Sequence, residues 1–212
     1  MYDDEFELTF DLSDEDKASR APEPEQEPVQ EAAPEPAAET EPPVEAVPEP
    51  AVPAANGRCV LISGGDRGIG AAAARAFWQA GYRVAVLYHK NAEAHAEAAA
   101  ALEKALPGLL AVQCDVASRA SCEVAFHTVE QAVGHVDVLV SNAGIAQQKL
   151  FTDITPEEWQ HMLDVNLSGA FHLCQLALPG MIRRKAGRIL TVSSMWGQTG
   201  GSCEVHYSAA KA

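Results

Sequence analysis

Arg58-Cys-Val-Leu-Ile-Ser-Gly-Gly-Asp-Arg-Gly-Ile-Gly70 joins an apolar run to a glycine-rich turn, and the helical pattern of residues 71–80 follows at once. Residues 58–62 have the composition of a buried parallel strand. Glycine allows a tight turn and a close approach of the backbone to a pyrophosphate, which would lie at the helix N-terminus. The alternative, a glycine-rich turn without a ligand, is weaker because a strand and a helix flank the motif.

Strand and helix patterns alternate from residue 81 to residue 140. Apolar runs at 81–88, 109–113 and 136–140 predict strands, and residues 91–106 and 118–134 have helical spacing. This alternation predicts an α/β fold, a Rossmann-type doubly wound parallel sheet with right-handed crossovers and its ligand at the carboxyl ends of the strands. Asp115 and residues 142–144 lie at such ends.

The second predicted strand lacks the terminal acidic residue that NAD-binding folds use to bind the adenosine ribose. Tyr88 occupies that place, His89 and Lys90 follow it, and Arg67 adds a cation to the glycine-rich turn. No carboxylate is expected there to repel a 2′-phosphate, and cations are available to pair with it. The sequence therefore predicts NADPH as the cofactor.

A second motif lies at the end of the chain, where Tyr207 and Lys211 are four residues apart and would share one face of a helix. An ammonium one turn from a phenol favours the phenolate and brings it closer to acid–base chemistry at neutral pH. A hydroxyl such as that of Ser194, from a separate strand end, could hold a substrate oxygen against the phenol. The same spacing is common on ordinary amphipathic helices, so its catalytic interpretation depends on the upstream glycine-rich turn.

The acidic charge is concentrated before residue 58. Residues 1–57 hold 17 of the 30 acidic and two of the 15 basic residues, and residues 21–55 hold ten of the 13 prolines. Such a segment buries too little apolar surface to offset its ordering entropy, so a disordered acidic tail is expected, followed by one domain at 58–212. Phe6, Leu8, Phe10 and Leu12 alternate with polar residues and could add a strand to a partner, but a disordered terminus is the favoured interpretation.

Several classes of protein are disfavoured by composition. Residues 58–212 have no net charge and no basic patch for nucleic acid, and no apolar run approaches the ~20 residues that span a bilayer. The N-terminus does not resemble a signal peptide, and no His/Cys cluster has metal-ligand spacing. Five cysteines without a C-x-x-C pair indicate reduced thiols in a cytoplasmic protein.

Taken together, the motifs resemble those of the short-chain dehydrogenase/reductase family, across residues 58–212 and in the family's order. The matching residues are Ser63, Gly64, Gly68, Ile69, Gly70, Asp115, Val116, Asn142, Ala143, Gly144, Asn166, Ser194, Tyr207 and Lys211. The resemblance implies that Asp115 receives the adenine amine and that residues 142–144 line the adenosine side of the cofactor.

Four of these residues would carry the chemistry if the resemblance holds. It implies that Tyr207 is the acid–base residue and that Lys211 favours its phenolate and holds the nicotinamide ribose. Ser194 would polarise the carbonyl, and Asn166 would hold a water that links Lys211 to solvent. A polar residue at a helix kink is the alternative for Asn166.

Within the family the chain is most similar to 3-oxoacyl-acyl-carrier-protein reductases, which implies NADPH-dependent reduction of a ketone in fatty acid biosynthesis. The segments 193–197 and 201–205 resemble those of elongation factor P 5-aminopentanone reductases, which implies a different carrier protein. Cys203 and Glu204 would then shape the substrate entrance, or they only pack and cap the helix. A non-catalytic NADP(H)-binding sensor or scaffold is the alternative from another class, and the complete Ser/Tyr/Lys set argues against it.

The resemblance also implies a longer, homo-oligomeric protein. Family members continue through two more strands, a substrate lid and a Pro-Gly segment that contacts the nicotinamide amide. We therefore expect a fragment whose sheet is incomplete at its C-terminal edge. Lys211, one residue from the end of the chain, is expected to be poorly fixed, so that the fragment itself shows little turnover.

Overall fold

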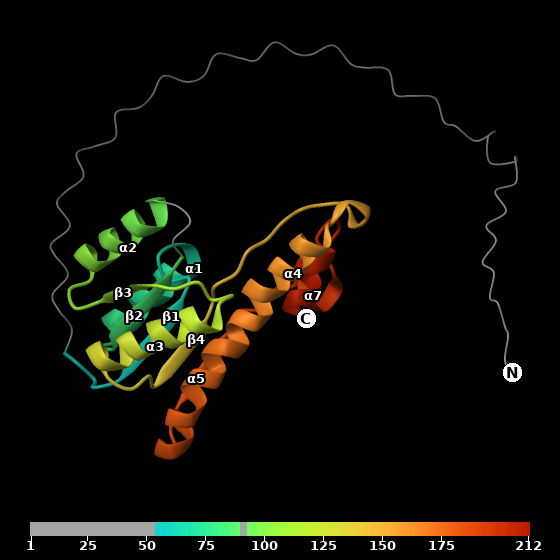
Figure 1. Cartoon of the computed structure of the whole chain (residues 1–212). Helices are drawn as coiled ribbons and strands as arrows, with labels where there is room; N and C mark the ends of the chain where they lie inside the picture. The colour runs from blue at the N-terminus through green and yellow to red at the C-terminus, as the bar shows by residue number, and fades with distance from the viewer. Residues whose placement is uncertain (1–53, 90–92) are drawn as a thin grey trace, which may run out of the picture. The chain divides into compact units, whose positions relative to one another are not determined.

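The computed structural model describes residues 54–89 and 93–212, so residues 1–53 of the predicted acidic tail, as well as Lys90, lie outside the described residues. Five parallel strands form one sheet in the order β3-β2-β1-β4-β5 (Figure 1). The strands are β1 (Cys59–Ser63), β2 (Arg83–Tyr88), β3 (Leu110–Gln113), β4 (Val138–Ser141) and β5 (Arg188–Thr191). The α/β prediction with a Rossmann-type parallel sheet is confirmed.

Strand β1 lies at the centre because all five of its residues are apolar or small, and all five are buried. Val60 pairs with Val84 of β2 on one side and with Val138 of β4 on the other. A strand covered on both faces has no polar face, which is why this strand reads as a continuous apolar run.

Different helices cover the two faces of the sheet (Figure 1). On one face Ile62 belongs to a core with Trp78 and Leu102, and on the other Leu61 belongs to a core with Phe126 and Leu173. The first core involves α1 (Gly68–Gln79) and α2 (Glu93–Ala105), and the second involves α3 (Arg119–Val133) and α5 (Gly169–Arg184). Alternate residues of β1 therefore hold both helical layers against the sheet.

The strand order places a crevice between β1 and β4. From β1 the chain builds the sheet outward through β2 and β3, then crosses to β4 and continues to β5 in the opposite direction. Ligands of open α/β sheets bind at such a switch point, beyond the carboxyl ends of the strands. The glycine-rich turn after β1 and residues 142–144 after β4 meet there.

The last part of the chain is mostly helical. Its elements are η2 (Phe151–Asp153), α4 (Pro156–Leu163), the π-helical turn η3 (Asp164–Ser168), α5, α6 (Trp196–Thr199) and α7 (Val205–Lys211). Helix α4 begins with a capping box, in which Thr155 and Glu158 exchange hydrogen bonds between side chain and backbone at 2.9 and 3.2 Å.

Strand β5 forms one edge of the sheet, and its Leu190 is 50% exposed. Within residues 54–89 and 93–212, no helix has the length and apolar character needed to span a membrane.

Candidate active site

The glycine-rich turn has a geometry that only glycine adopts easily. Gly64 has φ +61° and Gly68 has φ +53°, in the left-handed region that strains other residues. A Cβ atom on Gly70 would overlap the carbonyl oxygen of Gly64, so the start of α1 packs directly on the turn. The backbone is therefore close-packed where the sequence predicts a pyrophosphate.

Ser63 and Asn142 tie this turn to the end of β4. The Ser63 Oγ accepts hydrogen bonds from the backbone N–H groups of Asn142 and Ala143, both at 3.0 Å. The Asn142 side-chain amide donates to the carbonyl oxygens of Ser63 (3.0 Å) and Gly64 (2.9 Å). These residues fix the two sides of the crevice relative to each other.

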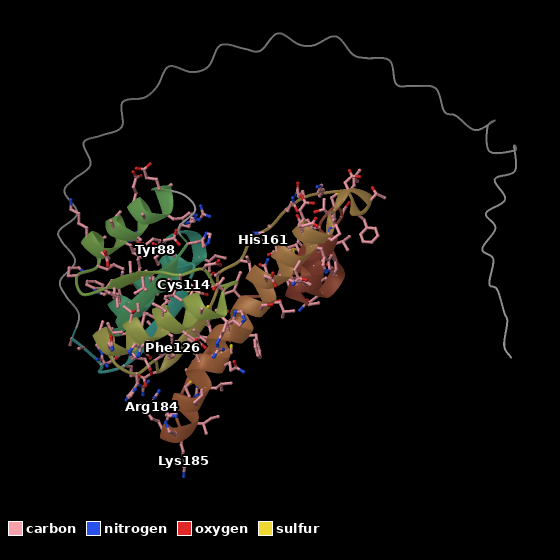
Figure 2. The ribbon with its side chains drawn as sticks, viewed as in Figure 1. Tyr88, Cys114, Phe126, His161, Arg184 and Lys185 are labelled. Atoms are coloured by element: carbon pink, nitrogen blue, oxygen red, sulfur yellow. The ribbon has the colours of Figure 1, made fainter. Side chains whose placement is uncertain are left out.

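A cavity of about 550 Å³ opens at the carboxyl ends of the strands. Its lining includes the predicted cofactor residues Gly64, Arg67, Ile69, His89, Asp115, Val116, Asn142, Ala143 and Gly144. Figure 2 labels three further lining residues, Tyr88 and Cys114 at the ends of β2 and β3 and His161 on α4. Ser63, Gly68 and Gly70 shape the turn without lining the cavity.

The same cavity contains a carboxylate that the sequence argument overlooked. Asp66 lines the cavity with a side chain that is 3% exposed, and its Oδ2 lies 2.5 Å from the Nδ1 of His95 on α2. The prediction of the cofactor considered only the end of the second strand and so did not weigh this carboxylate. The sequence of the glycine-rich turn includes Asp66, but its partner His95 lies on α2, 29 residues later in the chain. A more distant pair also lies in the cavity lining, where the Nε2 of His89 is 3.9 Å from the Oδ1 of Asp115.

Lys211 is held by the segment that follows β5. Its ammonium donates a hydrogen bond to the Val192 carbonyl oxygen (3.1 Å), and its own carbonyl oxygen accepts one from the Ser193 hydroxyl (2.7 Å). The expectation that this side chain would be poorly fixed is therefore wrong. The ammonium lies 6.0 Å from the centre of the Tyr207 ring, and partial burial lowers the pKa of Lys211.

Asn166 lies in the π-helical turn η3 and is 6% exposed. Its amide donates to the carbonyl oxygens of Ile145 and Met162, both at 3.0 Å, and its Oδ1 accepts from the Ile145 N–H at 3.3 Å. A Cβ on Gly144 would lie 2.6 Å from this Oδ1 and 3.2 Å from the Lys211 ammonium. Asn166, Gly144 and Lys211 therefore converge beside the cavity. Both amide hydrogens of Asn166 already donate to these carbonyl oxygens. A water molecule bound to Asn166 would therefore have to donate its own hydrogen to an oxygen of this residue.

Ser194 lies in the turn between β5 and α6, and its hydroxyl oxygen accepts a hydrogen bond from the Trp196 N–H at 3.3 Å. Nearby, the Lys149 N–H donates to the Cys203 carbonyl oxygen at 2.7 Å, and the Gln148 side chain donates to Glu204 at 3.2 Å. Glu204 precedes α7 without capping it through its side chain. The segments after β4 and before α7 are thus joined to each other by hydrogen bonds. Among the described residues, no group of three or more possible metal ligands is present.

Comparison with known proteins places this geometry in context. A family model described as short chain dehydrogenase matches residues 58–212. An acetoacetyl-CoA reductase of Shinella zoogloeoides is 41% identical over 155 residues, which are 73% of this chain and 62% of that protein. The 3-oxoacyl-[acyl-carrier-protein] reductase MabA of Mycobacterium avium is 38% identical over 160 residues, 76% of this chain and 58% of the relative. The crystal structure of gox2181 superimposes with a TM-score of 0.67 at 30% identity, covering 73% of this chain and 61% of that one. The chain thus spans about three-fifths of the length of these relatives.

Proposed function

Because the chain belongs to the short-chain dehydrogenase family, we propose that it carries the cofactor site and catalytic residues of an NADPH-dependent reductase that converts a ketone to an alcohol. The observation that carries this proposal is the position of the Lys211 ammonium. It lies beside Gly144 at the cavity and is on the same helix as Tyr207. A cation, a phenol and a nucleotide-sized cavity together suit the reduction of a carbonyl group.

The residues present fit the cofactor. The close-packed turn at Gly64, Gly68 and Gly70 would receive the pyrophosphate at the N-terminus of α1. Asp115 would bind the adenine and Arg67 the 2′-phosphate, and both line the cavity with His89. When bound, NADPH supplies the hydride for the carbonyl carbon.

Tyr207 would donate its phenolic proton to the carbonyl oxygen, with the Lys211 ammonium favouring the phenolate that remains. The Ser194 hydroxyl would donate a hydrogen bond to the same oxygen and orient it. Asn166 would position the Gly144–Ile145 backbone against Lys211, because its side chain bonds both backbone groups of Ile145.

We propose a 3-oxoacyl thioester as the substrate, carried on acyl carrier protein and used in fatty acid synthesis. The names of the relatives support this class, since acetoacetyl-CoA and 3-oxoacyl-acyl-carrier-protein both contain a 3-oxo thioester. The likeness of segments 193–197 and 201–205 to elongation factor P 5-aminopentanone reductases favours the aminopentanone on elongation factor P as the second candidate.

We also propose that the whole protein is a cytoplasmic homo-oligomer. All five cysteines are free thiols, as in a reducing compartment. Apolar side chains are exposed along α5 and the adjoining η3 turn, a pattern typical of association surfaces; these are Leu167, Phe171, Leu178 and Ile182. Light scattering of the purified whole protein tests the assembly, and a monomer at micromolar concentration would contradict it.

Replacing Tyr207 with Phe in the whole protein tests the chemistry. This change keeps the ring and removes only the hydroxyl, so turnover should fall by about 10²–10⁴ while NADPH binding persists. Turnover of a 3-oxoacyl thioester within a few-fold of the parent would refute the role of Tyr207. If the unmodified whole protein binds NADPH but shows no turnover, the sensor or scaffold alternative is favoured instead.

Cofactor choice is tested by Arg67→Ala. Loss of one charge-assisted contact to the 2′-phosphate should weaken NADPH binding by about 1.5–3 kcal/mol and leave NADH binding nearly unchanged. Arg75→Ala, at an exposed position of α1, is the matched control. Equal affinity of the unmodified protein for both cofactors would rule out the NADPH proposal.

A further inference from the structure

The carboxylate of Asp66 sits in an unusual place for a phosphate-binding cavity. It belongs to the glycine-rich turn, directly before Arg67, and it faces the cavity that Arg67, His89 and His95 also line. Its side chain is 3% exposed. A carboxylate that is nearly excluded from water requires a hydrogen-bond donor.

His95 supplies that donor from a different element. Its Nδ1 lies 2.5 Å from the Asp66 Oδ2, and a carboxylate only accepts hydrogen bonds, so Nδ1 must carry the hydrogen. The bond joins the turn after β1 to α2. Throughout residues 54–89 and 93–212, no second hydrogen bond reaches the Asp66 side chain, so the carboxylate depends on His95.

The pairing bears on which cofactor the cavity accepts. An unpaired carboxylate in the nucleotide cavity would accept a hydrogen bond from a ribose hydroxyl and would repel a 2′-phosphate, as the acidic residue of NAD-binding folds does. The Oδ2 atom that is bonded to His95 has less capacity to accept a further bond from that hydroxyl. The Arg67 guanidinium lines the same cavity and can pair with a phosphate there.

We propose that His95 is a specificity-determining residue that engages the Asp66 carboxylate and so allows the cavity to prefer NADPH over NADH. This inference rests on the proposed function, because it concerns the same cofactor site. It assigns the preference to two adjacent residues of the glycine-rich turn and to one residue of α2. Arg67 attracts the phosphate, a free oxygen of Asp66 would favour the ribose hydroxyl of NADH, and His95 occupies that oxygen.

A purely structural role for the pair predicts a different result. If the His95–Asp66 bond only held α2 against the turn, its loss would weaken NADPH and NADH equally. If His95 sets specificity, the ratio of the two dissociation constants changes. The ratio is therefore the quantity to measure.

The experiment titrates NADPH and NADH into the 212-residue chain and follows the fluorescence of the reduced nicotinamide. In His95→Leu the preference for NADPH should fall at least about tenfold, because the freed Asp66 oxygen can accept a charge-assisted hydrogen bond from the ribose hydroxyl of NADH, which the 2′-phosphate of NADPH cannot donate. His95→Asn should retain the preference, because its amide can donate in place of Nδ1. Adding Asp66→Asn to His95→Leu should restore it.

His127→Leu is the matched control, because His127 is an exposed histidine on α3 that bonds only Gln131 among the described residues. It should leave both dissociation constants within about twofold of the parent. Retained NADH binding in His95→Leu shows that the variant is folded. Equal weakening of both cofactors, or an unchanged ratio, overturns the role of His95 even if the parent binds NADPH tightly. A parent chain that binds neither cofactor overturns the proposed function, and the inference falls with it.

Discussion

Changing Asn166 to Asp tests whether this side chain organises the site through its hydrogen bonds. The substitution keeps the size of the side chain and its Oδ1, which accepts from the Ile145 N–H. It replaces the amide nitrogen, which donates to the carbonyl oxygens of Ile145 and Met162, with an oxygen that cannot donate when ionised. Two carbonyl oxygens then face a negative charge at 6% exposure.

The cost follows from the burial of the two lost bonds. The bond to Met162 is buried, and leaving such an acceptor unpaired costs about 1–3 kcal/mol. The bond to Ile145 is only partly buried and adds less, so the total loss of unfolding free energy is about 2–4 kcal/mol. Each kcal/mol should lower Tm by about 2–4 °C in a chain of this size.

Thermal unfolding followed by circular dichroism measures the effect, with Gln198→Glu on the exposed face of α6 as the matched control. The control introduces the same amide-to-acid change and should alter stability by less than about 0.5 kcal/mol. The penalty for Asn166→Asp should also shrink as the pH falls, because a protonated carboxyl can donate one of the missing bonds. A Tm equal to that of the control at neutral pH would show that these hydrogen bonds do not stabilise the site.

Gly70→Ala should lower stability by about 1–3 kcal/mol and weaken NADPH binding, because the added Cβ overlaps the Gly64 carbonyl. Gly68→Ala meets open space and should cost only about 1 kcal/mol, for its φ of +53°; equal Tm shifts in the two variants would contradict the packing argument. The hydrogen bond from Lys149 holds the pKa of the Glu158 carboxyl at about 2, below its ordinary 4.5. This stabilisation is present above pH 4.5 and is lost as the pH falls towards 2, so the Tm difference between the parent and Glu158→Gln should narrow over that range; a constant difference would show that the carboxylate charge is not involved.

The parts of the fold that sequence predicts well are those with local signals. The five residues of β1 are buried on both faces, so their apolar run identifies a central strand directly. Asp115 and residues 142–144 could be placed at the cavity because the carboxyl ends of parallel strands meet at one edge. Both predictions need only the order of the elements.

Side-chain partners at long range could not be predicted in this way. The bond between Asp66 and His95 depends on how α2 lies over the turn, and the anchoring of Lys211 depends on where β5 ends. The π-helical turn around Asn166 also leaves no periodic signal, since one widened turn hardly disturbs an apolar pattern. Such contacts depend on tertiary packing rather than on local preference.

The chain builds the sheet in one direction from β1 and in the other from β4, so residues of the two halves can be changed together in a double variant. His95 acts from α2, which packs against β2 and β3, whereas Tyr207 lies on α7, which packs against α4, α6 and η3. Changes at distant positions without shared partners usually add in free energy. The double variant should therefore show the same fold-change in cofactor preference as His95→Leu and the same fold-change in turnover as Tyr207→Phe. Cofactor choice could then drift or be engineered through α2 while the proposed proton transfer from α7 is left intact.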